Sequence, residues 1–97
     1  MIQIQGLYPA KTGLIYDSPM LRITFHGTPL GNLTIDIEVL NGNGANTGYL
    51  NLNIKKEDLV YKTEITDPYD SLLNAIQENI ILQLQSENTH NATFSII

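Results

Sequence analysis

The sequence predicts an α+β fold, in which an antiparallel sheet of about five to seven strands carries one C-terminal helix packed on one face. Three observations support this class. Runs of alternating apolar and polar residues fill the first two-thirds of the 97 residues, and a period of two is typical of half-buried strands. A helical apolar pattern then covers about residues 68–86, and residues 92–97 form a candidate final strand. A chain of this length indicates a single domain, residues 1–97.

Short strands separated by turn residues are expected in the N-terminal third. Residues 2–5 alternate isoleucine with glutamine, and Gly6 ends the run. Residues 13–17 are a further short strand candidate. The Asp-Ser-Pro sequence at 17–19 predicts a turn, because proline presets the backbone angle φ. Residues 21–26 alternate Leu, Ile and Phe with Arg, Thr and His, which predicts a strand with one buried face.

The stretch NGNGANTG, residues 41–48, has two interpretations: a hairpin turn or a phosphate-binding loop. A phosphate loop opens into a helix and, in P-loop enzymes, ends in Gly-Lys-Ser/Thr. Here a second alternating segment follows and the stretch contains no lysine. This favours a hairpin whose glycines supply positive φ. Folding residues 33–39 onto 50–54 about the centre of the stretch places the apolar side chains on one face. The predicted partners are Ile35 with Ile54, Ile37 with Leu52, and Val39 with Leu50.

The C-terminal third changes to a helical pattern. Residues 55–58 predict a turn and residues 59–65 one more strand. Asp67 then provides an N-cap and Pro68 the residue best suited to the first helical position. Ala75, Ile81 and Leu82 widen the apolar face of this helix, so we expect it to make contacts on more than one side. The residues that recur at helical spacing are Tyr69, Leu72, Leu73, Ile76, Ile80 and Leu84.

Composition excludes several classes of function. Five basic and ten acidic residues give a net charge of −5, so the basic footprint that direct nucleic-acid binding requires is absent. The charge either attracts a basic protein partner or only keeps the chain in solution. The chain has no cysteine, which excludes disulfides and thiolate metal centres. No signal peptide or membrane-spanning stretch is visible, so we expect a cytoplasmic protein without membrane contact.

No constellation of catalytic, cofactor-binding or metal-ligating residues is apparent. The only histidines are His26 and His90, and no HExxH motif occurs. None of the four serines lies in a Gly-x-Ser-x-Gly elbow. The first enzyme-like geometry to check is His26 close to Asp17 or Tyr16. We expect no cofactor.

One face of the predicted sheet gathers residues suited to binding. Asp36 and Glu38 lie about 7 Å apart on the outer face of one strand, and the predicted register sets them opposite Asn53 and Asn51. Such a set is either a solvated sheet face, a Ca²⁺ site or a glycosidase pair. Tyr49 falls on the same face beside Glu38, and tyrosine is enriched at protein contacts. The candidate partner-binding residues are therefore Asp36, Glu38, Tyr49, Asn51 and Asn53.

Two classes of function remain. The favoured one is a small acidic, non-enzymatic protein-interaction module, such as an inhibitor, an immunity-type protein, or a subunit of a phage or mobile element. The alternative is a small ligand-binding or hydrolytic enzyme with a site assembled from scattered Tyr, His and carboxylate residues. A homodimer formed through an unprotected edge strand is a further expectation.

Overall fold

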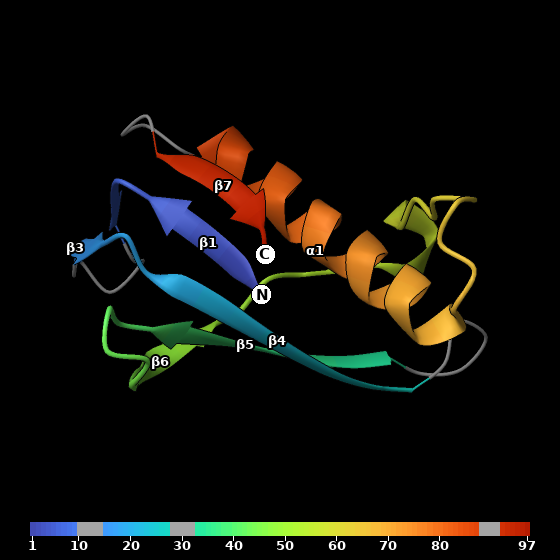
Figure 1. The fold of residues 1–97 in the computed structure, drawn as a ribbon, viewed down its shortest axis with the longest axis horizontal. Helices are drawn as coiled ribbons and strands as arrows, with labels where there is room; N and C mark the ends of the chain where they lie inside the picture. Colours follow the sequence, from blue (N-terminus) through green and yellow to red (C-terminus); the bar gives the residue numbers. More distant parts are fainter. Residues whose placement is uncertain (10–14, 28–32, 88–91) are drawn as a thin grey trace.

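The computed structural model describes residues 1–9, 15–27, 33–87 and 92–97. Within these residues, a five-stranded antiparallel sheet has the strand order β6-β5-β4-β1-β7, and one α-helix crosses one of its faces (Figure 1). The predicted α+β class, helix and final strand are confirmed. The elements are β1 (Ile2–Gln5), β2 (Leu7–Pro9), β3 (Ile15–Asp17), β4 (Met20–Gly27), β5 (Leu33–Leu40), β6 (Asn46–Leu50), η1 (Lys56–Asp58), α1 (Pro68–Glu87) and β7 (Thr93–Ile96).

A sharp bend at Gly6 takes the chain out of the main sheet. Gly6 has a φ of +111°, and a Cβ added there would lie 3.3 Å from the Cα of Ala92. The backbone angle therefore favours glycine, and a larger residue would also crowd the segment at Ala92. The amide of Ser18 donates to the carbonyl of Gly6 at 2.9 Å, which brings the returning chain back beside the bend.

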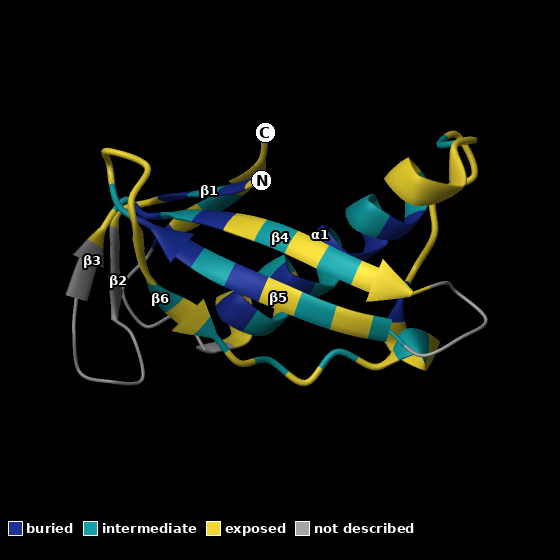
Figure 2. Cartoon of the chain, turned by 90° about the horizontal axis from the view of Figure 1, so that it is seen from below, coloured by how far each residue is buried: buried dark blue, intermediate teal, exposed yellow. Residues whose placement is uncertain are grey.

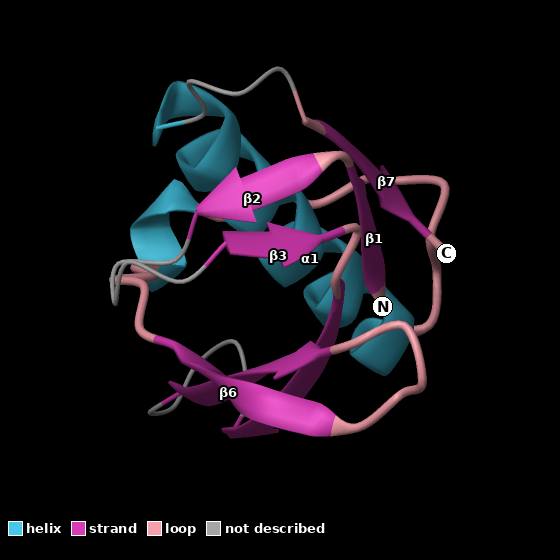
Figure 3. Cartoon of the chain, turned by 90° about the vertical axis from the view of Figure 1, so that its left-hand side faces the viewer, coloured by secondary structure: helices cyan, strands magenta, loops and turns pink. Residues whose placement is uncertain are grey.

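The chain between these two residues forms β2 and β3, an antiparallel pair that makes a second, smaller sheet at one end of the molecule (Figure 3). Of the strand predicted at residues 13–17, β3 covers Ile15–Asp17. Residues 13 and 14 lie outside the described residues.

The hairpin between β5 and β6 is present, but its predicted register is wrong by two residues. Ile37 lies opposite Leu50 instead of Leu52, and Val39 lies opposite Gly48. The side-chain oxygen of Asn41 accepts hydrogen bonds from the amides of Asn43 and Ala45 at 2.9 and 3.0 Å, which closes a tight loop over residues 41–45.

That closure lets β6 begin at Asn46, four residues earlier than expected, after an irregularity in the ladder between Val39 and Leu40. Within the loop, Gly44 supplies the expected positive φ, at +79°. A shift of two residues leaves every apolar side chain on its original face, because side chains alternate with a period of two.

The chain leaves the sheet after β6. Leu52 and Ile54 still pack against the core, and the carbonyl of Asn53 accepts a hydrogen bond from Gln83 of α1 at 3.0 Å. The predicted turn at 55–58 contains the short helix η1, but the strand predicted at 59–65 is wrong. Leu59 is buried against the core, and the amide of Ile65 donates to the carbonyl of Lys62. This backbone bond closes a turn where a strand would need a ladder partner.

Helix α1 starts as its sequence predicts. The carboxylate of Asp67 accepts a hydrogen bond from the amide of Asp70 at 3.0 Å, which satisfies one of the free donors of the first turn. Tyr69, predicted on the apolar face, is instead 60% exposed, although its ring stacks on Phe25 with centroids 4.9 Å apart. The buried stripe of the helix consists of Leu72, Ala75, Ile76, Ile80 and Leu84.

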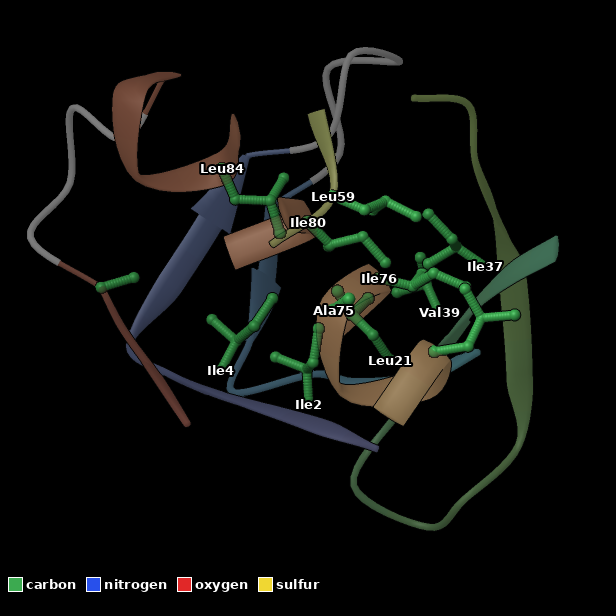
Figure 4. Packing of buried hydrophobic residues seen from close by; sticks show 12 residues of the cluster. Ile2, Ile4, Leu21, Ile37, Val39, Leu59, Ala75, Ile76, Ile80 and Leu84 are labelled. Atoms are coloured by element: carbon green, nitrogen blue, oxygen red, sulfur yellow. The ribbon is translucent and has the colours of Figure 1, made fainter. Parts of the chain in front are cut away.

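The core lies between this stripe and the inner face of the sheet (Figure 4). The sheet residues of this core cluster are Ile2 and Ile4 of β1, Leu21 of β4, and Ile37 and Val39 of β5. Each alternates with residues on the other face, as the period-two pattern requires. No helix among the described residues is long and apolar enough to cross a membrane.

Candidate functional site

The outer face of the sheet lies on the side away from α1 (Figure 2). Of the predicted binding residues, Asp36, Glu38 and Tyr49 lie on its strands. Residues 22, 24 and 26 of β4 alternate with core residues and lie opposite residues 38, 36 and 34 of β5. This antiparallel pairing sets Arg22 directly across from Glu38, and Thr24 across from Asp36. At residues 22–26 and 34–38 this face is polar, because the core takes the other half of each strand.

The carboxylate of Glu38 accepts hydrogen bonds from the side chains of Arg22 and Asn46. The guanidinium of Arg22 donates to both of its carboxylate oxygens, at 3.2 Å from Nε and 2.7 Å from Nη2. The side-chain amide of Asn46 donates to Oε2 at 2.9 Å. The hydrogen bonds from Arg22 lower the pKa of Glu38 below its usual range, and the same contact raises the pKa of Arg22. Glu38 is therefore a fixed anion, with its side chain only 17% exposed.

Tyr49 completes this arrangement on the next strand. It pairs with Glu38 across the β5–β6 ladder and is 66% exposed. We call Arg22, Glu38, Asn46 and Tyr49 the Tyr49 row, because they follow one another across β4, β5 and β6. Tyrosine and arginine are two of the residue types that are enriched in protein interfaces and among the residues that contribute most to binding.

The structure brings together only part of the predicted set. Glu38 and Tyr49 are neighbours, as expected from the sequence, and Asp36 is exposed two residues along the same strand. Asn51 and Asn53 do not oppose the two carboxylates, because the shorter loop shifts β6 and both residues lie beyond its end. Arg22 and Asn46 were missed, although an arginine across from a glutamate follows from the β4–β5 register.

The structure also bears on the metal site and the histidine geometry that the sequence suggested as alternatives. In the part of the chain that is described, no group of three or more histidines and carboxylates is placed to hold a metal ion. Glu38 already uses both oxygens on Arg22 and Asn46. His26 lies near the end of β4 and opposite Thr34, whereas Asp17 precedes the strand, so about 20 Å of extended chain separates them. The enzyme-like geometry that was to be checked, His26 close to Asp17, is therefore not formed along β4, and His90 lies outside the described residues.

A second surface, not predicted as a site, is an apolar groove of about 480 Å³ between α1 and the edge strand β7. Leu82 on one side is 65% exposed and Ile96 on the other is 39% exposed. Glu78 is paired with Lys62 at 2.7 Å, and this hydrogen bond raises the pKa of Lys62. The sequence signal was the widened apolar face at Ile81 and Leu82. The α1–β7 groove is lined by Glu78, Ile81, Leu82, Phe94, Ser95 and Ile96.

Comparisons with models of protein families, with curated proteins and with solved structures found no match to this chain.

Proposed function

We propose that the chain is a non-enzymatic protein-binding module, and that the Tyr49 row is the centre of its contact with the partner. The observation that supports this most is the exposure of Tyr49 above a fixed ion pair. Arg22 and Glu38 lose little further conformational freedom on binding, because they already hold each other. Tyr49 offers a large contact area and a polar tip at low entropic cost.

The charges of this face favour a basic partner. Arg22 and Glu38 neutralise each other, whereas Asp36 has no ion pair within the described residues. The face therefore keeps a negative charge, in agreement with the net charge of −5 of the whole chain. Attraction of this kind accelerates association with a basic target. Among the classes considered, an inhibitor or immunity-type protein fits best, because such proteins must reach their targets quickly.

The test is capture of partners from a lysate of the source cells with three baits: the wild type, Tyr49→Ala and Tyr61→Ala. Tyr61 is the matched control, because it is also exposed, at 42%, but lies outside the sheet. We expect a partner that is retained by the wild type and Tyr61→Ala and weakened at least tenfold by Tyr49→Ala, as for a central interface residue. Equal recovery with all three baits, or recovery of the bait alone, would contradict the proposal.

A further inference from the structure

Among the described residues, β7 has a strand partner on one edge of its backbone only. β7 ends the strand order and pairs with β1 alone within the described chain. The amide of Ile97 donates to the carbonyl of Met1 at 2.9 Å, so residues 1 and 97 form a hydrogen-bonded pair. Hydrogen-bonded and non-bonded pairs alternate along an antiparallel ladder. Phe94 and Ile96 therefore belong to non-bonded pairs and direct their N–H and C=O groups away from β1.

The same two residues present apolar side chains. Phe94 and Ile96 lie opposite Ile4 and Ile2, whose side chains are in the core, so all four share the face that bears α1. The helix does not fully cover β7, because Ile96 remains 39% exposed and Leu82 of the helix 65% exposed across the groove. A strand added to this edge would gain backbone hydrogen bonds and cover apolar surface at once.

The two edges of the sheet differ in protection. Edge strands are commonly shielded by charged residues, proline or bulges. β6 has an irregular ladder and Gly48 at a φ of +154°, which interrupts a regular edge. β7 has the sequence Thr-Phe-Ser-Ile, with no charge and no proline, and pairs regularly with β1 over all four residues.

We propose that this edge pairs with β7 of a second copy of the chain, antiparallel and about a two-fold axis at Ser95. In this register Phe94 lies opposite the second copy's Ile96, and the reverse pair follows by symmetry. Each pair joins outward-directed backbone groups and exchanges two hydrogen bonds. Ser95 faces its own symmetry mate in the close, non-bonded pair between them, where a small side chain fits.

Charge and side-chain chemistry favour a second copy over a foreign strand. The chain carries a net charge of −5, yet no charged residue lies on β7, so like charges do not face each other across the new ladder. Glu78, the only charged residue among the described residues that line the groove, is paired with Lys62 of its own chain. An aromatic residue opposes a β-branched one in both wide pairs, which stabilises antiparallel strands. The α1–β7 grooves of the two copies would also adjoin, covering Leu82.

This inference goes beyond the proposed function, because β7 is one edge strand of the sheet and Tyr49 lies on the other, β6. Its test is a charge exchange at Ser95, whose side chain is exposed. Light scattering coupled to gel filtration is expected to give twice the chain mass of 10.8 kDa for the wild type. Ser95→Lys and Ser95→Glu should each be monomeric, because like charges then meet at the two-fold axis. A mixture of the two variants should restore the dimer.

Thr24→Lys is the matched control, because it adds the same charge to an exposed site on the central strand β4 and should remain dimeric. Circular dichroism of each variant establishes that it is folded. Hydrogen exchange gives a second measurement, in which the amides of Phe94 and Ile96 are protected in the wild type and exposed in Ser95→Lys. A monomeric wild type with fast exchange at these amides would overturn the proposal, and a strand of another protein would then be the remaining candidate partner of this edge. A dimer that persists in both Ser95 variants would overturn it as well.

Discussion

The packing of α1 on the sheet can be tested by truncating Ile76, the residue at the middle of its buried stripe. Ile76 is 0% exposed and lies within the hydrophobic cluster between the helix and the sheet (Figure 4). Ile76→Ala removes three carbons, which at about 0.8 kcal/mol per buried methylene amounts to about 2.4 kcal/mol. The cavity left behind adds to this, whereas the better helix propensity of alanine recovers a few tenths. We expect a loss of about 3 kcal/mol in the free energy of unfolding.

Urea denaturation followed by circular dichroism measures this loss. With a slope of about 1–3 kcal/mol per molar urea, the midpoint should fall by about 1–3 M. Gln85→Ala is the control on the same helix, because Gln85 is exposed and its truncation should change stability by less than about 0.5 kcal/mol. All variants are compared at one protein concentration, since association adds to apparent stability. A loss below about 1 kcal/mol for Ile76→Ala would refute this packing of the helix.

Two further predictions concern polar contacts. Asp67→Ala should lower the free energy of unfolding by about 1 kcal/mol, because the amide of Asp70 loses its acceptor, whereas Asp67→Asn should retain most of the stability. The thermal midpoint should be about 4–8 °C lower in the alanine variant alone. An equal fall in both variants would contradict the capping role of Asp67. The hydrogen bonds from Arg22 lower the pKa of Glu38 in the fold, so the unfolded chain binds the proton more readily and the ion pair stabilises the fold above the ordinary pKa of 4.5. The wild type should be more stable than Glu38→Gln near pH 7, and this difference in the free energy of unfolding should diminish as the pH falls below 4.5. A difference that does not change with pH in urea titrations would exclude this role for Glu38.

The local elements could be predicted because each depends on residues close together in the sequence. The alternation in 21–26 and 33–39 determines which side chains enter the core, and Asp67 with Pro68 marks the start of α1. These signals arise from the geometry of the strand and of the first helical turn. They hold whatever the order of the strands.

The predictions that were wrong depended on contacts that alternation does not encode. The register of β6 followed from the side chain of Asn41, which closes the loop sooner than a symmetric fold of the glycine stretch implies. The strand predicted at 59–65 failed because Leu59 anchors this segment against the core, where it has no ladder partner among the described residues. Arg22 could not be assigned to the site without knowing that β4 pairs with β5. The α1–β7 groove could not be predicted without knowing that β7 lies beside β1.

The place of β1 between β4 and β7 has a consequence for the way the chain acquires its fold. Ile2 pairs with Leu21 on one side but with Ile96 on the other, so one edge of β1 is paired only by a strand that lies much later in the sequence. During synthesis this edge of β1 has no partner until β7 has been translated. The pairing of β1 with β7 closes a loop of most of the chain, and such long-range contacts form slowly. Linking residue 97 to residue 1 and opening the chain between β5 and β6 would turn this distant pairing into a neighbouring one, and would shorten the period in which a nascent strand is open to the wrong partner.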